Sequence, residues 1–259
     1  MGKLLAHQLK RHFTTNWFLI VAPIVATLLT FFSSAMDLSW AEVVLGFSVL
    51  GVIAFFMAAE ITIIVEDYQL YYGKSALFYQ SIPASAADKT FSRLIYYVIT
   101  LFIYSIINGA CFISLMMING LSEGLDVFGI MNQIFVELSN AARDAGWDTV
   151  LILIVFGIIY LVYSISKIIF SISVGSEKKL RKFGLGGPVL VYALTSLFET
   201  AVIFVIDRLG IITNIALEVN TDTITVDGGA FVFIGLCLIE AFVLLGITYF
   251  EHKNRVSVS

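Results

Sequence analysis

Long runs of apolar residues, separated by short polar stretches, dominate the pattern along this chain. An α-helix rises about 1.5 Å per residue, so about 20 apolar residues cross a hydrocarbon core about 30 Å thick. Six runs reach or approach that length: residues 17–36, 41–65, 94–118, 149–174, 188–206 and 230–250. The pattern therefore predicts an all-α integral membrane protein with six transmembrane helices.

The composition indicates that lipid surrounds these runs. Apolar residues make up 59% of the 259 residues and charged residues 13%, with a mean hydropathy of +0.95. Soluble domains average about 45–50% apolar and about 25% charged residues. The first run is 20 residues long, which exceeds the roughly 7–15 residues of a signal-peptide core, so we expect a retained anchor. The net charge of −4 gives no indication of a nucleic-acid partner.

Basic residues are sorted between the two sets of loops. Twelve Lys and Arg residues fall in the N-terminal arm, in the loops after the second and fourth spans, and in the C-terminal tail. The opposite loops hold two, Arg143 and Arg208. Under the positive-inside rule, this asymmetry predicts that both termini are cytoplasmic and agrees with an even number of spans.

The segments outside the spans have their own patterns. Residues 3–14 carry apolar residues at helical spacing on one face and basic residues on the other, which predicts an amphipathic helix at the inner membrane interface. The alternative is an unstructured basic flank that only sets topology. Residues 127–142 have a similar spacing and predict a second surface-lying or re-entrant helix, whereas 207–229 are expected to form an irregular external loop.

The segment 66–93, between the second and third spans, is rich in aromatic residues and is predicted to be cytoplasmic. Pro83 is expected to end one helix, and Ser85 followed by Asp88 is the pattern of a capping box that begins the next. We interpret the segment as a short, rigid elbow that docks on a soluble partner. The alternative is an interfacial aromatic belt that faces lipid headgroups.

The elbow resembles the corresponding segment of the permease subunits of bacterial type-2 ABC exporters. The matching residues are Tyr72-Gly73-Lys74-Ser75-Ala76-Leu77, then Ile82-Pro83-Ala84-Ser85, with Ile82 where the family usually has Leu, then Lys89 and Arg93. The resemblance also covers the six-span plan and the amphipathic arm. It implies that the elbow is the coupling helix contacted by a separate ATPase, with the contact residues Tyr68, Tyr71, Tyr72, Lys74, Phe78, Tyr79 and Pro83.

The resemblance also implies the partners and the location. These are a cytoplasmic ABC ATPase, a second permease subunit (identical or related) and the lipids of a bacterial plasma membrane. ATP and Mg²⁺ would bind the ATPase and no cofactor would bind this chain. Gly73-Lys74-Ser75 imitates the end of a phosphate-binding loop, but position 68, where the first glycine belongs, is Tyr68. The three histidines are scattered, so we expect no metal site and no catalytic site.

Ionisable residues inside a bilayer need a partner or water. At about 1.5 Å per residue, Glu60 and Lys167 lie about 26 and 27 Å from the outer ends of their spans, so we predict an ion pair between them. The alternative is that each side chain reaches water separately.

Glu199 and Glu240 each lie about 15 Å into a span, where no cation is expected at the same depth. Polar residues at helical spacing on neighbouring spans suggest faces that turn toward a shared interior. We interpret them as a translocation path, formed by Glu199, Glu240, Tyr192, Ser196, Tyr160, Ser164, Tyr104 and Asn108. The alternative is interhelical hydrogen bonding that only holds the bundle together.

We therefore expect the membrane-spanning permease subunit of an exporter for a hydrophobic or amphipathic substrate, such as a peptide or an antibiotic. The rival interpretation is a stand-alone membrane binding or scaffold component without ATPase coupling. An intramembrane enzyme is a third and weaker alternative.

Overall fold

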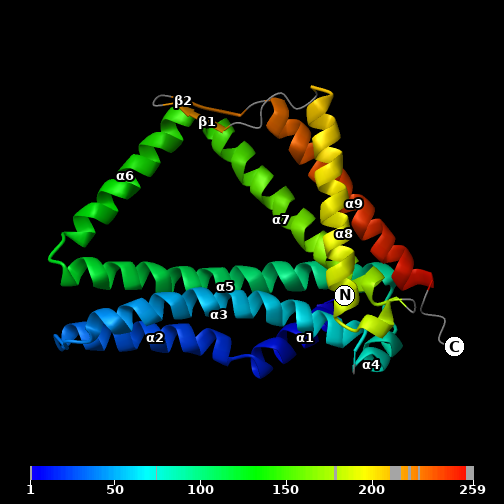
Figure 1. Cartoon of the computed structure of the whole chain (residues 1–259), viewed down its shortest axis with the longest axis horizontal. Helices are drawn as coiled ribbons and strands as arrows, with labels where there is room; N and C mark the ends of the chain where they lie inside the picture. Colours follow the sequence, from blue (N-terminus) through cyan, green and yellow to red (C-terminus); the bar gives the residue numbers. More distant parts are fainter. Residues whose placement is uncertain are drawn as a thin grey trace. The chain divides into compact units, whose positions relative to one another are not determined.

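The computed structural model describes residues 2–73, 75–177, 180–210, 217–220, 223–226 and 228–254. Within these ranges, six helices are long and apolar enough to cross a membrane (Figure 1). They are α2 (Phe18–Ala35), α3 (Ala41–Tyr71), α5 (Ala86–Ser122), α7 (Trp147–Gly175), α8 (Gly186–Arg208) and α9 (Gly228–Asn254). The predicted number and order of spans is confirmed, while the orientation of the termini stays a prediction.

The remaining elements are short or lie between the spans. They are α1 (Gly2–Thr15), α4 (Ala76–Ser81), α6 (Val127–Ala145), the 3-10 helix η1 (Arg181–Phe183) and the strands β1 (Leu217–Asn220) and β2 (Thr223–Val226). The helices expected over 3–14 and 127–142 are confirmed as parts of α1 and α6. Their placement at a membrane surface stays a prediction.

The chain forms two compact units. The N-terminal unit consists of Met1–Lys74 with Ile95–Phe135, and the C-terminal unit of Ser75–Leu94 with Val136–Ser259. Helix α5 therefore begins in the C-terminal unit and continues in the N-terminal one.

In the N-terminal unit, α2 packs beside α3 (Figure 1). Thr30 of α2 donates a hydrogen bond to Ser48 Oγ of α3 over 2.7 Å, and the Ser48 hydroxyl lies 3.1 Å from the Ala26 carbonyl oxygen. Small hydroxyl residues let two spans approach closely and join them by hydrogen bonds. Elsewhere in this unit, Val52 of α3 belongs to the same buried apolar cluster as Cys111 of α5.

In the C-terminal unit, α7 packs against both α8 and α9. The end of α7 and the start of α8 meet backbone to backbone. A Cβ added at Gly175 would lie 2.5 Å from Pro188 Cα, and one added at Gly187 would overlap the Gly175 carbonyl oxygen. Only glycine fits at these two positions, so they fix how α7 and α8 cross.

The outer faces of the spans are apolar. Within the most apolar 18-residue window of each span, between 6% and 22% of the residues are buried inside the protein. Side chains such as Phe47 and Phe242 lie largely exposed on these faces. Lipid can solvate such surfaces and water cannot, which agrees with the composition.

The described part of the segment 207–229 differs from the irregular loop expected there. Strands β1 and β2 pair antiparallel, with Leu217 opposite Val226 and Asn220 opposite Thr223. Over the described residues, the fold is therefore helical with one two-stranded antiparallel sheet. The sequence signal was present, because apolar and polar residues alternate along 217–220 and along 223–226, with two residues between these segments.

Candidate functional site

The elbow is shorter than the sequence indicated. Helix α3 continues to Tyr71, beyond the expected end at 65, and α5 begins at Ala86, before the expected start at 94. Hydropathy ends a span at its first charged residues, whereas the helical backbone continues until a turn stops it. Here the stop is at Gly73, whose N–H donates to the Tyr68 carbonyl oxygen over 3.0 Å. Only 72–85 connect the two spans, and α4 occupies the middle of that connection.

The ends of the helices beside the connection are formed as expected. Ile82, which precedes Pro83, has an extended backbone with φ −63° and ψ 127°, so α4 ends at Ser81. Ser85 Oγ accepts the Asp88 N–H over 3.0 Å and donates to the Asp88 carboxylate over 2.9 Å. The predicted cap at the start of α5 is confirmed.

The predicted ATPase-contact residues are distributed unevenly between surface and interior. Tyr71 and Tyr79 are 2% and 1% exposed, whereas Phe78 is 58% exposed and its neighbour Leu77 is 82% exposed. Tyr68 and Tyr72 are half-buried, Pro83 is exposed, and Lys74 lies outside the described residues. The exposed apolar surface of this segment is therefore on α4, at Leu77 and Phe78.

Helix α1 enters the N-terminal unit through a buried polar face. Leu4, Gln8 and His12 are buried on one side of it, four residues apart. Gln8 Nε2 donates to the Tyr71 hydroxyl over 2.9 Å, so Tyr71 contacts α1, and its contact with an ATPase stays a prediction. The apolar face with Leu9, which the sequence places at the membrane interface, remains half-buried.

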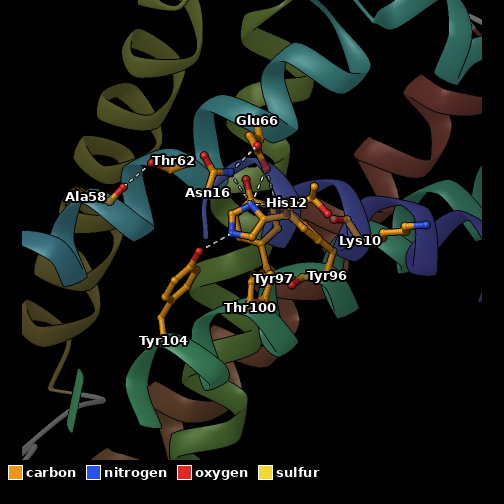
Figure 2. A network of polar contacts seen from close by, with 11 residues as sticks. Lys10, His12, Asn16, Ala58, Thr62, Glu66, Tyr96, Tyr97, Thr100 and Tyr104 are labelled. Atoms are coloured by element: carbon orange, nitrogen blue, oxygen red, sulfur yellow. Dashed lines mark hydrogen bonds and ion pairs between the residues drawn. The ribbon is translucent and has the colours of Figure 1, made fainter. Parts of the chain in front are cut away.

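His12 is the centre of a polar cluster that joins α1, α3 and α5 (Figure 2). Its ring is 0% exposed. Nδ1 lies 2.5 Å from Glu66 Oε2, and Nε2 lies 2.9 Å from the Tyr104 hydroxyl. Asn16, one turn further along the chain, donates to Glu66 Oε1 over 2.7 Å. The Glu66 carboxylate thus holds two side chains of the α1 segment.

Helix α5 completes the cluster. The Tyr96 hydroxyl lies 2.9 Å from His12 Nδ1 and donates to Glu66 Oε2 over 3.2 Å, and Tyr97 donates to Asp67 over 3.3 Å. Figure 2 shows these aromatic side chains reaching from α5 toward His12. We call His12, Asn16, Glu66, Tyr96 and Tyr104 the His12 cluster.

Sequence reasoning missed the His12 cluster, because His12 was treated as one of three scattered histidines. A signal was available: Gln8, His12 and Asn16 recur every four residues, which places them on one face of a helix. The sequence also predicted that the polar residues Tyr104 and Asn108 of one span face the interior. Burial of both side chains confirms that orientation. Their part in a translocation path stays a prediction.

The C-terminal unit contains a buried ion pair that differs from the predicted one. Lys167 of α7 binds Glu199 of α8, and its ammonium lies 4.8 Å from the centre of the Tyr192 ring. The expectation that no cation reaches Glu199 is wrong. Counted from the end of α7 at Gly175 and the start of α8 at Gly186, the two backbones differ in depth by about 8 Å, and the flexible four-carbon stem of lysine bridges that difference.

The other part of the predicted ion pair, Glu60, has an exposed side chain on α3 of the N-terminal unit. The Glu60–Lys167 pair stays a prediction, with Glu199 as the partner that the structure gives to Lys167.

The remaining residues of the predicted path also lie in the C-terminal unit. Tyr160 and Tyr192 are about half exposed. The hydroxyls of Ser164 and Ser196 each donate over 2.9 Å to the carbonyl four residues earlier in their own helix. Their polar groups are satisfied locally, and a role in transport stays a prediction for all four.

Glu199 and Glu240 line the same cavity, which lies between α7, α8 and α9 and has a volume of about 520 Å³. Oε2 of Glu199 binds Lys167, whereas Oε1 is buried without a hydrogen-bond partner. Because the lining is otherwise mainly apolar, this cavity is a candidate ligand site within the membrane.

A third polar cluster joins elements of the C-terminal unit near the ends of its helices. Arg93 of α5 is fully buried and donates to Ser173 of α7 over 2.9 Å. The same guanidinium nitrogen lies 3.2 Å from His252 Nε2 of α9. Over the described ranges, no three His, Cys, Asp or Glu side chains converge as a metal site would require.

Fold and site together define a multi-pass helical membrane protein with polar clusters buried among its spans. Comparison of the chain with protein-family models, with curated proteins and with solved structures finds no match in any of the three. A more specific function therefore has to be argued from the residues themselves.

Proposed function

We propose that this chain is the membrane-spanning permease subunit of an ABC exporter of the type-2 class. It pairs with a second permease subunit in a bacterial plasma membrane, and a separate cytoplasmic ATPase supplies the energy. The observation that carries the proposal is α4, a short helix between two spans that exposes Leu77 and Phe78 beside the Tyr72–Leu77 motif.

The chemistry of α4 suits a docking element. A six-residue helix has little stability of its own, yet this one is bounded by the turn at Gly73 and by the extended residue before Pro83. It presents two large apolar side chains, Leu77 and Phe78, at the surface. Exposed apolar residues on such a connection are typical of a helix that inserts into a groove of a partner.

The His12 cluster supports the coupling part of the proposal. A force on α4 is transmitted along the chain to the last turn of α3. That turn includes Tyr71, which binds Gln8, and it follows directly after Glu66, which binds His12. Movement of α4 would therefore displace α1 and α5 in the N-terminal unit. Coupling to an ATPase requires such a displacement.

Co-purification with an ATPase tests the proposal. The chain is expressed in its source organism and captured through its own tag, and any ABC ATPase that co-purifies is identified by mass spectrometry. A Leu77→Ala, Phe78→Ala double variant should lose the ATPase at unchanged expression, because the docking surface is gone. Phe47→Ala removes an exposed aromatic residue from a lipid-facing position of α3 and serves as the control with full capture. Equal capture by the double variant and the control would refute docking through α4.

The second candidate is a stand-alone membrane binding component. The cavity with Glu199 and Glu240 favours it, since a ligand site between α7, α8 and α9 does not need an ATPase. Absence of any stoichiometric ATPase, together with a ligand that stays bound through purification, would support this candidate over the exporter.

A further inference from the structure

The cavity between α7, α8 and α9 has the size and lining of a small-molecule site. Its volume of about 520 Å³ falls within the range of about 300–1,000 Å³ for such sites. Aromatic rings come from all three helices, and two carboxyl groups are the charged groups in its lining. These residues are Tyr163, Phe170, Phe198, Phe233, Glu199 and Glu240.

The charge facing the cavity is negative. Two acidic residues and no basic residue are among the described residues that line it. Lys167 lies to one side, where it is bound to Oε2 of Glu199. One lysine can balance one carboxylate, so a cation in the cavity would balance the charge of Glu240 when that carboxyl group is ionised.

One acceptor in the wall lacks a donor with hydrogen-bond geometry. Glu199 Oε1 is buried without such a partner, although the Tyr163 hydroxyl and the Glu240 carboxyl group lie beside the Glu199 carboxylate. A buried carboxylate oxygen without a donor is destabilising, and water is scarce in the hydrocarbon core. A protonated amine placed in the cavity would donate to this oxygen, and a cation of any kind would be attracted by both carboxyl groups.

The aromatic and apolar residues of the lining determine which uncharged part of a ligand the cavity accepts. Aromatic faces attract cations and also pack against apolar groups. An anion would be repelled by the two carboxyl groups, and a neutral hydrocarbon would leave Oε1 without a partner. Charge and lining therefore favour one class of ligand, with a single positive centre and an aromatic or aliphatic body.

We propose that this cavity binds lipophilic cations, with the positive centre held between Glu199 and Glu240 and the apolar body against the aromatic rings. The assignment of the cavity as the substrate site of an exporter rests on the proposed function, whereas the binding itself does not.

Equilibrium binding of two ions of the same shape and opposite charge tests the proposal. The purified full-length chain in lipid nanodiscs, without any ATPase, is titrated with tetraphenylphosphonium and with tetraphenylborate. We expect saturable binding of the phosphonium only. Glu199→Gln and Glu240→Gln should each weaken it at least tenfold. The control Glu42→Gln, an exposed carboxylate at the start of α3, should bind like the unmodified chain.

A second variant covers the case in which loss of Glu199 prevents folding. Val202→Trp fills the cavity but keeps every charge, and it should also weaken phosphonium binding at least tenfold. The proposal is overturned if the unmodified chain shows no saturable phosphonium binding, if tetraphenylborate binds equally well, or if folded Glu→Gln and Val202→Trp variants keep full affinity. Phosphonium binding in a chain that captures no ATPase would overturn the exporter and leave the cation site in place.

Discussion

Replacement of His12 by Phe should release α1 from the N-terminal unit. Phe keeps an aromatic ring of similar size, so the packing against Phe13 and Tyr104 is largely preserved. The change removes the contacts of Nδ1 with Glu66 and Tyr96, at 2.5 and 2.9 Å, and the contact of Nε2 with Tyr104, at 2.9 Å. The variant therefore measures the polar contacts of the His12 cluster separately from its packing.

The magnitude follows from what each partner keeps. Glu66 retains the Asn16 amide and the Tyr96 hydroxyl as donors. Loss of its contact with His12 therefore costs about 1 kcal/mol, the low end of the roughly 1–3 kcal/mol for a buried group left without a partner. The buried Tyr104 hydroxyl loses the partner described for it and adds a loss of similar size. Together the destabilisation of the docked α1 is about 2 kcal/mol, which is about thirtyfold in the opening equilibrium.

Hydrogen–deuterium exchange measured by mass spectrometry is a suitable assay. Amides of residues 2–15 exchange through opening of α1, so their protection should fall by about thirtyfold in the variant. Lys10→Gln, on the exposed face of the same helix, is the matched control and should change protection by less than threefold. Unchanged protection in His12→Phe would mean that the buried contacts of His12 do not hold α1 in place, and the coupling route through it would fail.

Three further predictions concern the C-terminal unit and the topology. Gly175→Ala forces a Cβ into the Pro188 backbone and should lower the stability of the purified protein by about 1–3 kcal/mol in thermal unfolding. The control Gly157→Ala lies on the same helix with open space around it, so it should leave stability unchanged or raise it by up to about 1 kcal/mol. Equal effects of the two changes would contradict the close crossing of α7 and α8. Lys167→Met and Glu199→Leu should each be more destabilising alone than when both are combined, because either single change leaves a buried charge unpaired. If the losses of stability of the two single variants simply add in the double variant, measured by thermal unfolding, the Lys167–Glu199 pair is refuted. Leu77→Cys should react with a membrane-impermeant maleimide in inverted vesicles and not in intact cells; labelling from outside intact cells would overturn the predicted orientation and the docking role of α4.

The N-terminal helices show how much local sequence specifies. Spans are set by long apolar runs, and caps such as Ser85 with Asp88 are set by residues three positions apart, so both could be predicted. The ends of α3 and α5 could not be predicted from hydropathy. Charged residues such as Glu66 continue the helix when neighbouring elements satisfy them, and that condition depends on residues about 50 positions away in the sequence.

The candidate sites depended still more on tertiary contacts. Sequence placed Glu199 and Glu240 at mid-membrane depth, and both do line one cavity. Matching depths along helices leaves Glu199 without a partner and pairs Lys167 with Glu60, because it ignores which faces meet and how far a lysine side chain reaches.

The sequence by itself determined that this chain is a six-span helical membrane protein, because the requirement to satisfy backbone groups in lipid acts on each segment separately. Only the tertiary structure decided which polar side chains meet within each unit: His12 with Glu66, and Lys167 with Glu199. Pairing between helices depends on their rotation and relative height, and many rotations of an apolar helix are compatible with the same hydropathy. Buried polar groups select among those rotations only once the neighbouring helix is in place.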